Sequence, residues 1–230
     1  MKLSTIYLLL VFCCSVTFIY SLDDSSSDAF PFWPTQWVTD WTIIYTSSDQ
    51  EPPFSNNNIP PPFKGGSGRT YYDWSNQAMH EVYNDFCVPI FSNGSDWTCD
   101  FINVKGVSYL VTHDDRPADV PPCCIFGDPW YPPAPNFIQT CGAVQNVTSS
   151  LNGQQVDYWT IYLPDSGSFG YGFYANGTSN GWTPASFYFA AAPSGWTIQN
   201  FENFQPTTPP ANAFQVPDSC INASPCPPQG

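Results

Sequence analysis

The sequence predicts an all-β protein built as two stacked, curved antiparallel sheets, in the form of a half-open barrel or a sandwich. Three observations predict this class. Apolar and polar residues alternate with a period of two in many segments, whereas no convincing stretch shows helical spacing. Helix-forming Ala, Leu, Glu and Lys are scarce, while the chain holds 18 Phe, 13 Tyr and 9 Trp. Many of the 25 prolines stand between the alternating segments and predict long Pro-rich loops.

Residues 37–45 form the first predicted strand, since Trp37, Thr39, Trp41, Ile43 and Tyr45 alternate with the residues between them. A Pro-rich connection follows at 52–62, because proline cannot donate a hydrogen bond to a sheet. The glycines of 65–68 are expected to release the chain into a hairpin over 69–83 that bends at 74–76.

Two further hairpins are predicted at 100–112 and 144–163. The first turns at Lys105-Gly106 and the second at Asn152-Gly153, which is the strongest two-residue hairpin signal in the chain. The segment 114–135 between them is expected to be a loop. Strands at 170–174, 185–191 and 197–204 complete a set of nine or ten, which implies stacked or curled sheets.

Residues 1–21 are predicted to be a secretory signal peptide. Lys2 precedes an apolar run over 6–19 that ends near the small Ser21. A membrane anchor is the alternative, but a hydrocarbon core of about 30 Å needs a longer run. Residues 22–230 are then one domain, with flexible ends expected at 22–35 and 221–230. We expect the protein to be secreted, or to reside in the lumen of the secretory pathway.

Seven cysteines remain after the leader, and an oxidising compartment favours disulfides among them. At most three intramolecular pairs can form, so one cysteine is free or joins a second chain, and a homodimer stays open. The neighbouring pair of cysteines is expected to have two separate partners rather than a strained vicinal bond. No metal site is expected, because neither histidine stands at ligand spacing from the cysteines. The seven are Cys87, Cys99, Cys123, Cys124, Cys141, Cys220 and Cys226.

Glycosylation and charge describe the expected surface. Four Asn-x-Ser/Thr triplets predict N-glycosylation at Asn93, Asn146, Asn176 and Asn222. The chain has 5 Lys and Arg against 19 Asp and Glu, a formal charge of −14. This charge repels phosphate groups, so nucleic acids and acidic membrane surfaces are poor partners.

No catalytic constellation is recognised, so we expect no enzyme and no cofactor. A nucleophile elbow needs Gly-x-Ser-x-Gly, which the chain does not supply. The best acid–base candidate is His113-Asp114-Asp115, and a solvated turn is the favoured interpretation of it. An enzymatic role would require His113 to lie in a cleft near a nucleophile or a second carboxylate.

The aromatic residues either fill a core or line a pocket, and both interpretations stay open. The segments 169–174 and 187–189 place rings on both faces of their strands, which a sheet does when it is sandwiched or lines a pocket on one side. Which face each residue occupies depends on strand register. The candidate pocket residues are Tyr72, Met79, Tyr109, Trp159, Phe173 and Phe187.

Several short motifs resemble secreted ependymin-like glycoproteins and their relatives. They are the hairpin from Gly68 to His80, the Cys123-Cys124 pair, the hairpin from Asn152 to Trp159 and the closing segment from Phe214 to Cys220. The resemblance implies two curved sheets, similar to bacterial lipoprotein carriers, that enclose an apolar pocket for a lipid-like ligand. It also implies dimerisation and an association with calcium, but it supplies no catalytic residue. Relatives often have a basic residue after the methionine, where this chain has His80-Glu81.

The residues and the resemblance together predict a non-catalytic secreted glycoprotein that binds a hydrophobic or lipid-like small molecule between β-sheets. The alternative is an extracellular matrix or adhesion glycoprotein that makes protein or glycan contacts. In that case Trp33, Trp37 and Trp130 should form an exposed patch.

Overall fold

The protein forms one antiparallel sheet of eleven strands, in the order β6-β5-β4-β3-β2-β1-β11-β10-β9-β8-β7. The computed structural model describes residues 30–54, 60, 63–88, 95–127, 129–163, 167–175, 181–190 and 195–227. The strands are β1 (Gln36–Thr46), β2 (Phe63–Asp73), β3 (Ala78–Asn84), β4 (Cys99–Val104), β5 (Val107–Thr112), β6 (Cys123–Ile125), β7 (Val144–Leu151), β8 (Gln154–Leu163), β9 (Gly167–Tyr174), β10 (Pro184–Ala190) and β11 (Trp196–Gln205). The helical segments are short: η2 (Trp74–Asn76), α2 (Phe137–Thr140) and η3 (Asp218–Cys220).

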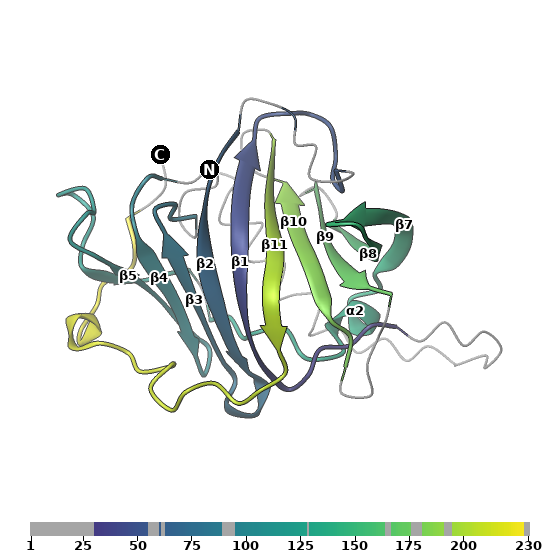
Figure 1. The fold of residues 1–230 in the computed structure, drawn as a ribbon. Coiled ribbons are helices and arrows are strands. Elements are labelled where there is room, and N and C mark those ends of the chain that lie inside the picture. Colours follow the sequence, from purple (N-terminus) through teal and green to yellow (C-terminus); the bar gives the residue numbers. More distant parts are fainter. Residues whose placement is uncertain are drawn as a thin grey trace.

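The all-β, half-open fold predicted from the sequence is confirmed. The sheet is strongly curved (Figure 1), and its edge strands β6 and β7 do not pair with each other, so the barrel stays open. The expected two sheets are the two halves of a single sheet, because β1 and β11 pair at its centre and join them.

The predicted hairpin turns are confirmed. Lys105 and Gly106 have φ angles of 51° and 86°, and Asn152 and Gly153 have 52° and 76°. Positive φ at both central residues is the geometry that matches the twist of two paired strands. The hairpin of β2 and β3 turns through η2, where the Asp73 side chain accepts a hydrogen bond from the Asn76 backbone N–H at 3.2 Å.

Two local expectations were wrong. The glycines of 65–68 lie inside β2 rather than before it, and Gly68 pairs with Trp41 of β1. A Cβ at Gly68 would stand 2.1 Å from the Trp41 ring, so the glycine makes room for the indole. Residues 123–125, expected as loop, form β6 and pair with β5.

The sheet has an inner face, which we define as the side occupied by Trp37, Trp41 and Ile43 of β1. Period-two alternation places these three side chains together in the main apolar core. Residues 129–143, the covering loop, lie over this face and include α2 (Figure 1). The loop is held by backbone hydrogen bonds from Trp33 N–H to the Pro135 carbonyl at 2.9 Å and from Trp130 N–H to the Gly106 carbonyl at 3.1 Å.

The outer face carries two smaller apolar clusters. One gathers around Tyr158, Tyr188 and Phe54, and the other around Ile102 and Val111. The chain after β11 runs along the lower end of the sheet towards β5 in Figure 1 and packs on the second cluster. The outer face is therefore covered at both ends of the sheet, by residues 52–54 and by the C-terminal segment.

Three intramolecular disulfides are confirmed: Cys87–Cys99, Cys123–Cys220 and Cys124–Cys226. The neighbouring Cys123 and Cys124 have separate partners, as predicted, and Cys141 lies outside the three bridges. Disulfides are consistent with an oxidising compartment such as the extracellular space or the periplasm. Where the structure describes the two predicted ends, they make contacts, because Trp33 is buried and Cys226 is bridged to β6.

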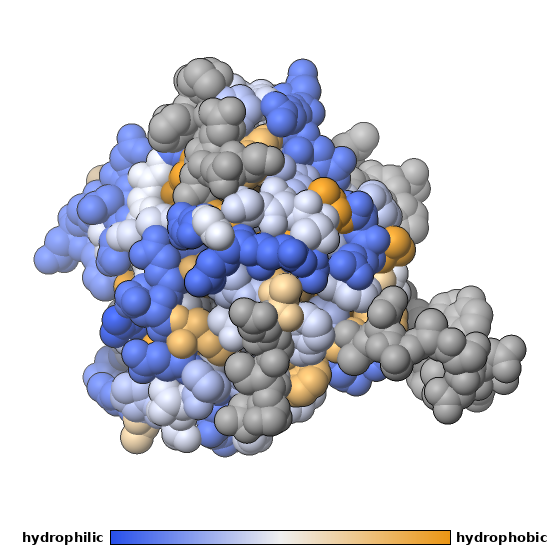
Figure 2. Space-filling model, turned by 45° about the vertical axis from the view of Figure 1, so that its right-hand side comes forward, coloured by the Kyte–Doolittle hydropathy of each residue, from blue (hydrophilic) through white to orange (hydrophobic). Residues whose placement is uncertain are grey.

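The predicted leader, Asn93 and Asn176 lie outside the described residues. Asn146 and Asn222 are exposed, as a glycan acceptor must be. Within the described parts of the chain, no helix is both long enough and apolar enough to span a bilayer. Figure 2 shows one side of the surface as largely hydrophilic, with small scattered hydrophobic patches.

Candidate binding site: a cavity on the inner face

A cavity lies on the inner face of the sheet, under the covering loop. The space open to the centre of a water molecule is about 90 Å³. One buried water needs roughly 10–15 Å³ measured in this way, so the cavity is several times larger than a single hydration site. Its lining is mainly apolar and consists of Trp33, Trp37, Ile43, Thr70, Met79, Glu81, Tyr83, Phe101, Trp130, Pro133, Phe169, Tyr171, Phe187, Phe189, Gln199 and Phe201.

Aromatic rings of β9 and β10 form one wall. Tyr171 and Phe187 are stacked with ring centroids 4.5 Å apart, and Phe189 lies 5.3 Å from Phe187. Phe169 adds an edge contact to Tyr171 at 6.3 Å. Phe187 and Phe189 remain half-buried although they point to the inner face, because the space in front of them is not filled by protein.

The covering loop and the segment before β1 close the cavity from the other side. Trp33 contacts Trp37 at 5.3 Å between ring centroids, and Trp37 stacks on Tyr72 at 5.1 Å. Tyr72 is fully buried, and its hydroxyl donates a hydrogen bond to the Pro133 carbonyl at 2.6 Å. Burial also raises the pKa of Tyr72, so its hydroxyl stays a donor. This bond ties the loop to the sheet beside the cavity.

A small polar group lies among the aromatic walls. Glu81 of β3 accepts a hydrogen bond from the Tyr83 hydroxyl at 2.9 Å and a long one from the Thr70 hydroxyl at 3.5 Å. Thr70 in turn accepts a hydrogen bond from Trp41 Nε1 at 2.8 Å. Burial raises the pKa of Glu81, and the hydrogen bonds from Tyr83 and Thr70, together with the nearby Gln199 amide, oppose that rise. The inner face therefore holds an ionisable group whose charged form is disfavoured.

The six predicted pocket residues occupy different places. Met79 and Phe187 line the cavity. Tyr72, Trp159 and Phe173 belong to the same buried core but do not border the cavity; Trp159 packs against Phe30 and Phe173 against Trp182. Tyr109 lies in the outer cluster around Ile102, because Leu110, not Tyr109, is the β5 residue that joins the inner core.

Most of the lining residues were missed as pocket candidates, among them Trp33, Trp37 and Trp130. These three tryptophans were expected to form an exposed patch if the protein were an adhesion glycoprotein, and that expectation is wrong. They are only 4%, 2% and 9% exposed. Trp37 shares the alternating face of β1 with Trp41, so the sequence held a signal for it. Trp33 and Trp130 come from irregular segments, and no local pattern assigns them to a face.

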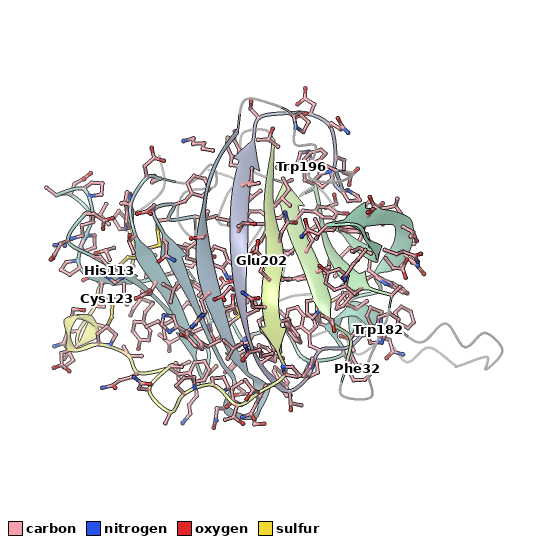
Figure 3. The ribbon with its side chains drawn as sticks, viewed as in Figure 1. Phe32, His113, Cys123, Trp182, Trp196 and Glu202 are labelled. Atoms are coloured by element: carbon pink, nitrogen blue, oxygen red, sulfur yellow. A yellow bond between two sulfur atoms is a disulfide. The ribbon has the colours of Figure 1, made fainter. Side chains whose placement is uncertain are left out.

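The predicted acid–base candidate does not border the cavity. His113 directly follows β5, at the left of the sheet in Figure 3, and its side chain is 46% exposed. Its Nε2 lies 3.2 Å from Asp100 Oδ2, while the other Asp100 oxygen lies 3.6 Å from His80 Nε2. Asp115 accepts a hydrogen bond from the Thr98 backbone N–H at 2.7 Å, so it links the loop after β5 to the start of β4.

Within the described ranges, no three His, Cys, Asp or Glu side chains gather in a way that could hold a metal ion. The calcium association implied by the motif resemblance therefore has no site assigned to it.

No family model and no curated protein matches the chain, so the ependymin-like resemblance stays a prediction from short motifs. Solved structures are similar at low identity. An uncharacterized conserved protein from Thermus thermophilus is 7% identical with a TM-score of 0.45, and the match covers 83% of this chain and 90% of that one. A LolA superfamily protein from Nitrosomonas europaea is 6% identical with a TM-score of 0.36, over 81% of this chain and 92% of that one.

A structure of the Pseudomonas aeruginosa MucA/MucB complex is 11% identical with a TM-score of 0.39, over 84% of this chain. The match spans 58% of that longer chain. At this level of similarity the three structures do not identify a function.

Proposed function

We propose that this protein is a secreted, non-catalytic binding protein that holds a small hydrophobic molecule, or the end of one lipid-like chain, in the inner cavity. The observation that supports the proposal is the cavity of about 90 Å³, open between aromatic walls in a core that is otherwise closely packed. Filling such a space with an apolar group removes aromatic surface from water and gains dispersion contacts that the empty cavity lacks.

The arrangement of the lining supports binding rather than accidental under-packing. The half-buried rings of Phe187 and Phe189 stand on the rigid sheet, whereas the opposite wall includes Trp130 and Pro133 of the covering loop. A ligand can therefore be enclosed by a small movement of the loop while the sheet stays in place. The predicted leader and the three disulfides support secretion as the context.

The direct test is native mass spectrometry of the protein purified from its own source, followed by extraction with organic solvent. We expect an added mass that the extraction removes. A clean unliganded mass would count against the proposal, and so would a titration in which the extracted protein fails to bind a short-chain aliphatic probe.

Cavity-filling variants test whether the probe binds in the inner cavity. In Met79→Trp the larger side chain should occupy the space and abolish probe binding, and Phe189→Trp should weaken it. Tyr109→Trp, on the outer face, is the matched control and should bind as the native chain does. Urea unfolding of each variant establishes that it is folded. Equal binding by all three folded variants would contradict the assignment of this cavity.

A further inference from the structure

Glu81 is the one residue among Asp, Glu, Lys, Arg and His in the lining of the inner cavity as the structure describes it. It stands on β3 between Met79 and Tyr83, both of which also line the cavity. Glu81 is half-buried, and its side chain borders the cavity. A ligand in the cavity therefore meets this carboxyl directly.

The hydrogen-bonding capacity of Glu81 is not used up by the protein. An ionised carboxylate offers about four acceptor positions on its two oxygens, and a protonated carboxyl keeps acceptor capacity beside its one O–H donor. The Tyr83 hydroxyl occupies one at 2.9 Å, and the Thr70 hydroxyl approaches a second at 3.5 Å, the limit of a hydrogen bond. At least one acceptor position remains for a donor that comes from the cavity.

Gln199 supplies the complementary group. It lies on β11 between Ile43 and Phe187 in the register of the sheet, and it is only 4% exposed. Its amide is near enough to Glu81 to favour the ionised carboxyl, but its Nε2 makes no hydrogen bond to any group that the structure describes. A buried amide donor without a partner costs free energy, which a ligand acceptor would relieve.

The head group that suits both residues must donate and accept at once. A hydroxyl does this, since it donates to Glu81 and accepts from Gln199 Nε2. An ammonium group only donates, and an ionised carboxylate only accepts. A carboxylate would also lie beside the carboxyl of Glu81, and the described residues of the lining include no Lys or Arg to pair with it.

We propose that the inner cavity selects an aliphatic ligand with a hydroxyl head group, placed between Glu81 and Gln199, and discriminates against the corresponding carboxylate. This inference rests on the proposed function, because it assumes that the cavity binds an apolar chain. It goes further by naming the head-group class and the two residues that recognise it.

The test is calorimetric titration of the extracted full chain with octanol, octylamine and octanoate, which share one apolar tail. We expect octanol to bind at least about tenfold more tightly than octanoate, with octylamine between them. Octanoate or octylamine binding as tightly as octanol would overturn the head-group proposal while leaving the proposed function intact. Failure of all three to bind would overturn both.

Two substitutions assign the selectivity to Glu81. Glu81→Met keeps the length of the side chain but removes its polar atoms, so octanol should lose about tenfold in affinity. Glu202→Met, on β11 at the centre of Figure 3, is an exposed control outside the cavity and should leave all three affinities unchanged. An unchanged octanol affinity in folded Glu81→Met would overturn the proposal.

Discussion

The two disulfides that fix the C-terminal segment should contribute to stability in a strongly non-additive way. Cys123–Cys220 and Cys124–Cys226 join neighbouring residues of β6 to one short segment, at sequence separations of 97 and 102. Either bridge alone closes a loop of nearly the same size. Once one is formed, the other closes only a small ring, because its two cysteines are already held near each other.

The chain-entropy relation gives the magnitudes. Closing a loop with a separation of 97 or 102 stabilises the folded state by about 4.7 kcal/mol. The second bridge closes a ring of about nine residues, which contributes about 2.6 kcal/mol. Removing either pair alone should therefore cost about 2.6 kcal/mol, and removing both should cost about 7 kcal/mol, a large part of the total stability of an ordinary domain.

The assay is urea unfolding at equilibrium of three Cys→Ala variants: the 123/220 pair, the 124/226 pair and all four positions. The control is the 87/99 pair, which closes a separate loop with a separation of 12 and should cost about 2.8 kcal/mol in any background. If each single removal near β6 costs as much as about 4 to 5 kcal/mol, or if the two costs simply add, the reasoning from shared loop closure is refuted.

Three further predictions concern the cavity and its support. Glu81→Gln should gain stability relative to the native chain as pH rises. A carboxyl whose pKa is raised in the folded state stabilises that state fully only below its unfolded-state pKa. This contribution to the free energy of unfolding falls by up to about 1.4 kcal/mol per pH unit as pH rises through the folded-state pKa. Gly170→Ala should cost about 1–3 kcal/mol in urea unfolding, since its Cβ would lie 2.3 Å from the Tyr188 ring. Tyr72→Phe should cost about 1–3 kcal/mol and speed probe release in stopped-flow fluorescence, because it leaves the half-buried Pro133 carbonyl without its partner.

Each of these three has an outcome that would contradict it. A stability difference between Glu81→Gln and the native chain that is constant with pH would show that Glu81 has no raised pKa. For Gly170→Ala, the cost should shrink in a Tyr188→Leu background, and an equal cost there would exclude the ring as its cause. For Tyr72→Phe, unchanged release with reduced stability would show that the hydroxyl holds the fold but not the covering loop.

Local sequence signals predicted the parts of the fold that depend on neighbouring residues. The alternation of Trp37, Trp41 and Ile43 predicted β1 and its buried face, because side chains on a strand alternate whatever it pairs with. Asn152-Gly153 predicted its hairpin because its two backbone conformations are encoded in the dipeptide itself.

Features that depend on distant residues were not predicted. The three-residue strand β6 follows prolines and exists through its pairing with β5 and its bridges to Cys220 and Cys226, which lie far along the chain. Gly68 was expected to stand before the hairpin, but it lies inside β2, where it accommodates the Trp41 indole of the neighbouring strand. The same holds for the cavity, whose cover includes Trp130, a loop residue with no periodic pattern to place it.

The charge of the whole chain and the chemistry of the cavity select against the same ligands. A formal charge of −14 repels anions as they approach, and this long-range effect weakens with salt. Inside the cavity the discrimination has a different origin, because Glu81 and the absence of Lys and Arg from the described lining leave a bound anion without a partner. Salt screens charges in a buried site much less than charges at the surface. Discrimination between octanol and octanoate should therefore persist at high salt if it arises at Glu81, and should fade if it arises from the surface charge.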